Sequence, residues 1–196
     1  MLSAVILAAG ESRRMGEPKA LVRFGRHFFL ETIVANFRTA GIENPVVVLG
    51  HDAAHIQEKL GHLASRFVIN KDYPCGQFSS VQTGVAALTA DVEGVFLALV
   101  DQPQIGSQII AMLKEAFLAT SQKIVIPTCN GRRGHPPILP RALFEEIASA
   151  PPTENAAAII RRHRELIREI ETGDESILWN INTKQELQNL RARFNF

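Results

Sequence analysis

A chain of 196 residues is long enough for one domain with a sizeable core and is short for two. Its hydrophobic share of 46% argues against a disordered chain, and its formal net charge of +1 provides no overall field that would favour nucleic acid or an acidic membrane. Its two cysteines favour neither a disulfide framework nor a zinc cluster.

The first apolar run, residues 5–9, is too short to span a membrane, and no basic stretch precedes it as in a signal peptide. We therefore expect a cytoplasmic protein with no membrane partner and no nucleic-acid partner.

Short apolar runs rich in β-branched residues alternate with segments of helical spacing. The apolar runs are residues 5–7, 46–49, 67–69, 95–100 and 124–126. Helical stripes lie between them, namely Phe29, Ile33, Val34 and Phe37, and Ile109, Met112, Leu113 and Phe117. Strands that are apolar throughout indicate a parallel sheet covered on both faces. Right-handed crossovers then predict a single domain, residues 1–196, that forms a three-layer α/β/α sandwich with a mostly parallel, doubly wound, Rossmann-like sheet.

The last third of the chain is expected to add helices and two further strands. The Pro-rich segment 132–140 is typical of a loop that leads into an edge strand. The Pro-Pro pair at 151–152 separates two predicted helices, 141–149 and 155–163. A strand is expected near residues 177–181, followed by a helix over 183–193 that Thr183 and Glu186 start as a capping box.

The segment VILAAGESRRMGEPK, residues 5–19, ends the first strand in a turn rich in positive charge. In a doubly wound sheet, ligands bind at the carboxyl ends of the strands, where this turn lies. Gly10 lets the backbone approach a ligand, backbone N–H groups in such a turn can surround an anion, and Arg14 and Lys19 add full charges. The pattern is neither the Walker sequence nor GxGxxG. It favours a nucleoside triphosphate, although a surface turn with solvated charges also accounts for it.

The same segment, Leu7-Ala8-Ala9-Gly10-x-Ser12-x-Arg14-Met15-Gly16-x-x-Lys19, resembles the opening motif of the nucleotidyltransferases that act on molybdenum cofactor. The resemblance implies a nucleotide-diphospho-sugar transferase-type architecture, with the nucleotide in the N-terminal half and the acceptor in the C-terminal half. It implies that Arg14 and Lys19 stabilise charge in the transition state. It also implies that the loop binds the nucleotide through Leu7, Ala8, Ala9, Gly10, Ser12, Arg14 and Lys19.

The segment GQFSSVQTGV, residues 76–85, resembles the part of the family that contacts the base and ribose. Ser79 and Ser80 would cap the following helix and offer hydroxyl groups to the nucleotide, and a plain N-cap explains either serine alone. Phe78 stands where the family usually has a small residue, and Gln82 where it often has arginine. These departures leave the details of base contact open.

The segment FLALVDQPQI, residues 96–105, ends the central apolar strand in one carboxylate, Asp101. A carboxylate at this tip is well placed to hold Mg²⁺, which prefers oxygen ligands together with substrate phosphates. The alternative is an aspartate that caps the helix after Pro103. The family's Asp-x-Pro motif at this place implies that Asp101 is a metal ligand and a catalytic residue.

The segment RGHPPIL, residues 133–139, resembles a Gly-His-Pro segment of the family's cytidylyl branch. It lies in the half where the acceptor is expected, so His135 and Arg133 are candidate acceptor contacts, although a lone histidine is also explained as structural. A solvated helix face explains the remaining basic cluster more simply, and that cluster is Arg161, Arg162, Arg164 and Arg168.

The segment WNINTKQEL, residues 179–187, resembles the closing motif of the family. Its polar pair is Asn180 and Asn182, where the cytidylyl branch usually has two aspartates. The resemblance implies that Asn182, which precedes Thr183, is the second Mg²⁺ ligand. A neutral ligand would weaken metal binding in the absence of nucleotide. Both asparagines could instead only cap the last helix.

The four main motifs follow in family order over residues 5–187. Together they imply transfer of CMP from CTP to the phosphate of molybdenum cofactor (molybdopterin), with Mg²⁺ as cofactor and release of pyrophosphate. The attacking phosphate is anionic near neutral pH, so positioning and charge neutralisation would carry the catalysis. A molybdenum enzyme or its chaperone is an implied partner.

Other functions stay open at this stage. Ala9 favours CTP because its methyl would crowd a purine, whereas the asparagine pair favours GTP and the GMP form of the same cofactor. A sugar-phosphate or methylerythritol-type cytidylyltransferase shares the first loop, and the Gly-His-Pro segment favours the pterin branch over it. A chaperone that binds and delivers molybdenum cofactor would carry out no chemistry, so pyrophosphate release separates it from an enzyme. The lone carboxylate at the strand tip disfavours a purely structural module.

Overall fold

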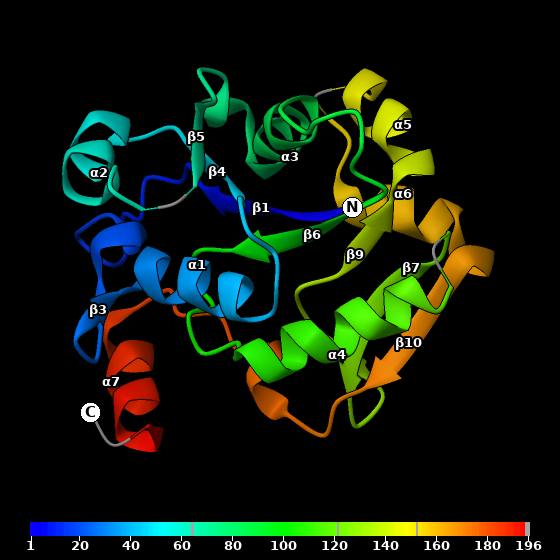
Figure 1. Cartoon of the computed structure of the whole chain (residues 1–196). Helices are drawn as coiled ribbons and strands as arrows, with labels where there is room; N and C mark the ends of the chain where they lie inside the picture. The colour runs from blue at the N-terminus through cyan, green and yellow to red at the C-terminus, as the bar shows by residue number, and fades with distance from the viewer. Residues whose placement is uncertain (64, 121, 152, 195–196) are drawn as a thin grey trace.

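Eight strands form one mixed sheet within the computed structural model, which describes residues 1–63, 65–120, 122–151 and 153–194 (Figure 1). The strand order is β10-β7-β9-β6-β1-β4-β5, with β8 paired to β7 outside this path. The strands are β1 Leu2–Ala8, β4 Val46–Leu49, β5 Arg66–Ile69, β6 Gly94–Leu99, β7 Ile124–Cys129, β8 Arg132–Arg133, β9 Ile138–Pro140 and β10 Ile167–Glu171. All five apolar runs predicted as strands fall in this sheet, apart from Val100, which follows β6.

The pairing directions identify the edge of the sheet where a ligand can bind. Strand β1 pairs in parallel with both β4 and β6, and β4 with β5 and β7 with β10 are also parallel. From β1 the parallel strands β4 and β5 follow on one side and β6, β7 and β10 on the other, with antiparallel β9 inserted between β6 and β7. In such sheets the crevice for ligands lies at the carboxyl ends of the strands, where the order reverses. Here that point is the carboxyl edge of β1 and β6.

Helices cover both faces of the sheet, as predicted (Figure 1). One face packs against α1 Phe29–Thr39, α2 Ala53–Leu60 and α4 Ser107–Leu118, and the other against α3 Gln77–Ala86, α5 Phe144–Ser149 and α6 Ala156–Arg162. Alternation along β1 supplies both cores, because successive side chains of a strand point to opposite faces. Ala4, Ile6 and Ala8 belong to the first core, whereas Val5, Leu7 and Ala9 belong to the second.

The last helix, α7 (Lys184–Arg193), packs against the loop that follows β1. Leu187 and Leu190 share a third core with Met15 and with Ile181, which precedes the helix. The predicted capping box is confirmed: the Glu186 backbone N–H donates to Thr183 Oγ1, and the Thr183 backbone N–H donates to Glu186 Oε2. This packing brings the end of the chain to the first loop.

The predicted strand at residues 177–181 is wrong. A 3₁₀ helix, η5 (Glu175–Leu178), occupies the start of this segment. The side-chain amide of Gln104 donates to the carbonyl oxygens of Ser176, at 3.0 Å, and Trp179, at 2.8 Å. Within the predicted strand, the Ile177 carbonyl oxygen accepts from the His135 N–H at 3.1 Å and the Trp179 carbonyl oxygen accepts from Gln104, so neither bonds to a neighbouring strand.

The prediction that segment 132–140 is a loop leading into an edge strand is also wrong. The first residues of the segment form β8, and β9 lies inside the sheet, antiparallel to both β6 and β7. β9 can lie inside the sheet because the prolines are before the strand or at its end, where a missing N–H group does not interrupt the hydrogen bonds between strands. Pro137 precedes β9 and Pro140 is its last residue, so the N–H groups of Ile138 and Leu139 remain available.

The edge on the other side of β7 is β10, which the sequence pattern does not predict. Its five residues include two glutamates and one arginine, so it lacks the apolar run that marks the other strands.

The two helices predicted on either side of the Pro-Pro pair are present. The first, at 141–149, forms η3 (Arg141–Leu143) followed by α5, and the second, at 155–163, forms α6, which Asn155 caps. Pro152 of the pair lies outside the described residues. None of the helices in the described ranges combines the length and the apolar character needed to cross a bilayer.

Candidate active site

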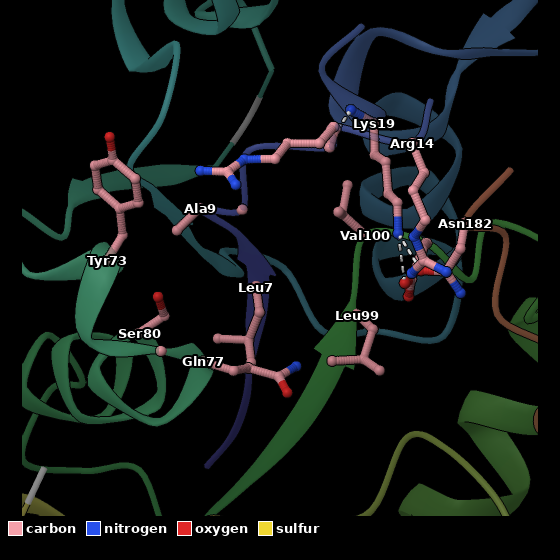
Figure 2. Close-up of a pocket in the computed structure, with 15 residues that line it drawn as sticks. Leu7, Ala9, Arg14, Lys19, Tyr73, Gln77, Ser80, Leu99, Val100 and Asn182 are labelled. Carbon is pink, nitrogen blue, oxygen red and sulfur yellow. Dashed lines mark hydrogen bonds and ion pairs between the residues drawn. The ribbon is translucent and has the colours of Figure 1, made fainter. Parts of the chain in front are cut away.

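A cavity of about 420 Å³ opens at the carboxyl edge of β1 and β6 (Figure 2). Its walls come from the loop after β1, the turn η2 (Tyr73–Cys75) with the start of α3, the end of β6, and the segment before α7. Figure 2 shows Arg14, Lys19 and Asn182 gathered on one side and Tyr73, Gln77 and Ser80 on the other. We call the side that carries Arg14, Lys19 and Asn182 the charged wall. Its lining residues are Leu7, Ala9, Gly10, Ser12, Arg13, Arg14, Lys19, Tyr73, Gly76, Gln77, Ser80, Leu99, Val100, Asp101 and Asn182.

The loop after β1 is held over the cavity by its own hydrogen bonds. The Ser12 carbonyl oxygen accepts from the N–H groups of Met15, at 2.9 Å, and Gly16, at 3.2 Å. The Ser12 hydroxyl accepts from the Lys19 N–H at 3.1 Å, and the buried Met15 side chain anchors the loop in the third core. All but one of the predicted loop residues line the cavity. The exception is Ala8, which points into the first core because it lies on the opposite face of β1 from Leu7 and Ala9.

Lys19, Asp101 and Asn182 meet at the charged wall. The Lys19 ammonium donates to Asp101 Oδ2 and to Asn182 Oδ1, each at 2.8 Å. The lysine and aspartate side chains are only 14% and 16% exposed. The other carboxylate oxygen, Asp101 Oδ1, is buried and has no hydrogen-bond partner among the described residues. Oxygen atoms from two distant segments thus bind one ammonium group. Asp101 can still accept a further hydrogen bond or bind a metal ion through Oδ1.

Asn182 is held in place by the start of α7. Its backbone N–H donates to Glu186 Oε2 at 2.7 Å, and the preceding Ile181 N–H donates to the Asp101 carbonyl oxygen at 2.9 Å. Burial raises the pKa of Glu186, but hydrogen bonds from Asn182 and Thr183 and the charge of Arg14 outweigh it, so the pKa falls below its usual value. Asn180 faces elsewhere, because its Oδ1 accepts from the Gln102 amide at 2.7 Å. Of the two asparagines, Asn182 is the one that faces the cavity.

The two serines of α3 differ in what they contact. Gly76, not a serine, is the N-cap, so the prediction that Ser79 and Ser80 cap the helix is wrong. Asn70 Nδ2 donates to both hydroxyls, at 2.8 and 2.9 Å. The Ser79 hydroxyl, with its one proton, lies within hydrogen-bond distance of the carbonyl oxygens of Asp72 and Gly76, and only Ser80 lines the cavity. The pair mainly joins the end of β5 to the first turn of α3.

Side chains that sequence reasoning missed also line the cavity. Tyr73 lies opposite the charged wall (Figure 2). Arg13, which precedes Arg14 in the chain, also lines the cavity. The Arg13 side chain is 84% exposed and forms an ion pair with Glu11. The one sequence signal for Tyr73 was an aromatic residue in the turn just before the GQFSS segment.

A second cavity of about 540 Å³ adjoins the first, and Leu7, Gln77 and Leu99 line both. His135 and Arg133 line it as well, together with Arg161 from α6. Arg133 donates to Glu169 at 2.7 Å, which offsets its charge. Arg161 makes no hydrogen bond or ion pair with any described residue. The other walls are largely apolar and include Phe78, Val81, Leu97, Ile126 and Ile160.

The four arginines predicted to share one solvated helix face do not do so. Arg161 and Arg162 are in α6, whereas Arg164 is in the 3₁₀ helix η4 (Arg164–Leu166) and Arg168 is in β10. Arg162 forms ion pairs with Glu146 and Glu154, at 2.8 and 2.7 Å. Of the four, only Arg161 lines either of the two cavities described above.

The side-chain oxygens of Asp101 and Asn182 at the charged wall are suitable ligands for a divalent ion that also binds substrate phosphates. Within the described ranges, no three His, Cys, Asp or Glu side chains are grouped to form a metal site. Mg²⁺ is commonly held by one or two protein oxygens together with waters and substrate phosphates. Asp101 and Asn182 supply two such oxygens beside the cavity, and Asp101 Oδ1 is a buried acceptor without a partner.

His135 is expected to make stability depend on pH. Burial lowers the pKa of His135 below its ordinary value, opposed by a hydrogen bond with the Leu97 backbone and by the charge of Asp101. As pH falls below about 6.5, the unfolded chain takes up a proton at this position before the folded chain does. Stability is therefore lost as pH decreases. In His135→Gln, the decrease of Tm between about pH 7.5 and pH 5.5 should be smaller than in the wild type.

Thermal melts of both proteins measure this difference. His55→Gln removes an exposed histidine of α2 and should retain the wild-type pH dependence. Curves for wild type and His135→Gln that run parallel over this range would contradict the prediction.

Three relatives show how widely similar sequences differ in name. A Paenarthrobacter nicotinovorans protein named nicotine blue oxidoreductase is 27% identical over 96% of each chain. The molybdenum cofactor cytidylyltransferase of Escherichia coli is 23% identical over 98% of this chain and 97% of its own. A Bacillus cytotoxicus protein named "Probable molybdenum cofactor guanylyltransferase" is 31% identical over 67% of this chain and 64% of its own.

Solved structures share the fold. The Mycobacterium tuberculosis protein Rv0371c matches with a TM-score of 0.83 at 22% identity, covering 96% of both chains. A structure of the same protein in complex with manganese matches with a TM-score of 0.78 at 21% identity, over 96% of this chain and 97% of that one. A nucleotidyl transferase from Methanothermobacter has a TM-score of 0.82 at 23% identity, over 100% of this chain and 98% of that one.

The match that decides the family spans most of the chain. Residues 4–167 match the family described as MobA-like NTP transferase domain, and this range includes the first loop, the α3 motif, Asp101 and the Gly-His-Pro segment. The chain therefore belongs to the MobA-like NTP transferase family and is a nucleotidyltransferase.

Proposed function

We propose that this chain transfers CMP from CTP to the phosphate of molybdenum cofactor and releases pyrophosphate. One observation carries the proposal: the Gly-rich loop, Asp101 and Asn182 line a single cavity, and Lys19 Nζ lies 2.8 Å from an oxygen of each of the last two. The names of two relatives support this acceptor. Residues 1–196 would act as one domain, with the nucleotide in the N-terminal half and the acceptor in the C-terminal half.

In the proposed reaction, an oxygen of the acceptor phosphate attacks the α-phosphorus of the nucleotide. The bond from that phosphorus to the bridging oxygen breaks, and pyrophosphate leaves with the electron pair. Arg14 and Lys19 neutralise the charge that develops on pyrophosphate. Asp101 and Asn182 hold Mg²⁺, which when bound supplies further charge neutralisation, and the neighbouring structure solved with manganese supports a divalent ion.

The second cavity is the proposed acceptor site. It adjoins the first at Leu7, Gln77 and Leu99, so an acceptor bound there reaches the nucleotide at the junction. Its apolar walls suit a flat ring system, and its cationic side chains suit an anionic group. Arg161 is the better candidate than Arg133 for direct contact, because Arg133 is paired with Glu169.

Arg161→Ala is expected to raise the KM for the acceptor about tenfold, because one charge-assisted hydrogen bond is lost. The KM for the nucleotide should stay near the wild-type value, since Arg161 does not line the first cavity. Steady-state kinetics with each substrate varied in turn measure both. Arg164→Ala, on the neighbouring 3₁₀ helix, is the matched control. Equal KM values for the acceptor in all three proteins would remove Arg161 from the acceptor site.

Ala9 is the proposed determinant of base choice. Its side chain lines the first cavity, and a methyl there favours a pyrimidine over a purine. A group of this size discriminates by about 1–3 kcal/mol, so the wild type should prefer CTP without excluding GTP. Ala9→Gly is expected to raise kcat/KM for GTP by about one order of magnitude and leave that for CTP largely unchanged. A wild type that already prefers GTP would favour the guanylyl alternative.

The decisive test is pyrophosphate release with each nucleoside triphosphate, with and without molybdenum cofactor. Release that requires CTP and the cofactor supports the proposal. Release with GTP makes the chain a guanylyltransferase, and release with a different phosphorylated acceptor makes it another small-molecule cytidylyltransferase. Binding of the cofactor without release under any condition identifies a chaperone that delivers it to a molybdenum enzyme.

Oxidoreduction is the second candidate, because the relative named nicotine blue oxidoreductase matches over 96% of both chains. Neither cavity is lined by a cysteine: Cys75 is exposed and Cys129 is buried in the first core. Electrons would then come from a second substrate or a cofactor rather than from a cysteine in either cavity. Oxidation of NADH or NADPH in the presence of nicotine blue, without pyrophosphate release from any nucleotide, would favour this candidate.

A further inference from the structure

The Lys19 ammonium stands where the proposed metal ligands converge. It is 2.8 Å from Asp101 Oδ2 and 2.8 Å from Asn182 Oδ1, and little of either charged side chain is exposed. The three residues come from the first loop, the end of β6 and the segment before α7. A single cation thus joins all three segments.

The ammonium and a divalent ion cannot use this position together. Mg²⁺ binds oxygen at about 2.0–2.1 Å, so an ion bound to Asp101 Oδ2 and Asn182 Oδ1, the two oxygens that Lys19 contacts, would lie in the space where Nζ now sits. Charge opposes joint occupancy as well. Asp101 is the one carboxylate among the described residues that line the cavity, and Lys19 already neutralises it. Asn182 adds no charge.

We propose that Lys19 is a displaceable occupant of the metal site, which couples metal binding to nucleotide binding. Without nucleotide, the ammonium competes with the ion for Asp101 and Asn182. When a triphosphate enters, the flexible lysine side chain turns to the phosphates and frees both oxygens for the ion. Metal binding is then weak alone and strong with nucleotide, and by linkage the metal strengthens nucleotide binding by the same factor. This inference rests on the proposed function, because it takes Asp101 and Asn182 as the metal ligands.

Titration with Mn²⁺ in the absence of nucleotide tests the competition directly, with free Mn²⁺ measured by electron paramagnetic resonance. Lys19→Met removes the ammonium and keeps the length of the side chain. We expect it to bind Mn²⁺ about tenfold more tightly than the wild type, within the range usual for coupled sites. Lys19→Arg retains a cation and should bind as weakly as the wild type. Lys123→Met removes the same charge far from the cavity, on the segment before β7, and should also match the wild type.

A second comparison separates the competition from the metal site itself. Asp101→Asn in the Lys19→Met background should weaken Mn²⁺ binding by tenfold or more, as expected for loss of a carboxylate ligand. If this double variant binds weakly but Lys19→Met binds no more tightly than the wild type, the competition is refuted and the metal assignment stands. If the double variant binds as well as Lys19→Met, both the metal assignment and the competition fail. Lys19→Gln, expected to change in the same direction, replaces Lys19→Met if circular dichroism shows that the latter is unfolded.

Discussion

Asp101→Asn is expected to lower kcat by about 10³-fold, because it removes the charge of the one carboxylate among the described residues that line the first cavity. Asparagine has nearly the same shape as aspartate. The hydrogen bond from the Ile181 N–H to the backbone carbonyl at 101 also remains possible. The fold should therefore survive, while the ability to hold a divalent ion at the phosphates is lost. Pyrophosphate release at limiting Mg²⁺ measures the effect.

Asp52→Asn is the matched control for this change. Asp52 is exposed, follows β4 and lies outside both cavities. Its φ of +54° is a conformation that asparagine adopts readily, so the substitution adds no backbone strain. Activity should stay within about twofold of the wild type, as for surface substitutions in general. A folded Asp101→Asn protein with near-normal turnover at limiting Mg²⁺ would refute the metal assignment.

Arg14→Met is expected to lower kcat/KM for the nucleotide by about 10²-fold and to leave the KM for the acceptor nearly unchanged. Arg14 lies beside Lys19 and Asn182 at the charged wall (Figure 2). It is absent from the second cavity. Its guanidinium is proposed to neutralise the leaving pyrophosphate, which methionine cannot do. Kinetics with each substrate varied separately distinguish the two sides of the reaction.

Arg26→Met provides the control, since Arg26 is exposed in the turn between β2 (Arg23–Phe24) and β3 (His27–Phe28) and lines neither cavity. It removes the same charge and should leave both kinetic constants unchanged. If Arg14→Met mainly raises the KM for the acceptor, the loop after β1 binds the acceptor. The first cavity would then be the acceptor site and the second the nucleotide site.

Much of the fold followed from local pattern. The apolar runs in β1, β4, β6 and β7 became strands because residues buried on both faces must be apolar throughout, and this property is visible without knowing the neighbours. The capping box of Thr183 and Glu186 was equally visible, because its hydrogen bonds join residues three apart. The family motifs were recognisable for the same reason, since each is contiguous in the chain.

The errors arose where distant residues decided the structure. The segment at 177–181 has a strand-like sequence, but its Trp179 carbonyl oxygen accepts from Gln104, which comes from the turn after β6. Strand β9 lies inside the sheet because β6 and β7 leave a gap for an antiparallel strand. No local pattern reports either contact.

The sequence by itself determined the α/β fold, the turn at the end of β1 and the charged residues that it carries. Only the tertiary structure decided which of those residues meet. Lys19 reaches Asp101 across 82 positions of the chain and Asn182 across 163. The choice of Asn182 over Asn180 depends on Gln102, and the separation of Arg161 from the other arginines depends on how α6 packs. The physical reason is that residue spacing fixes the face of an element on which a side chain lies, whereas packing between elements fixes what that side chain contacts.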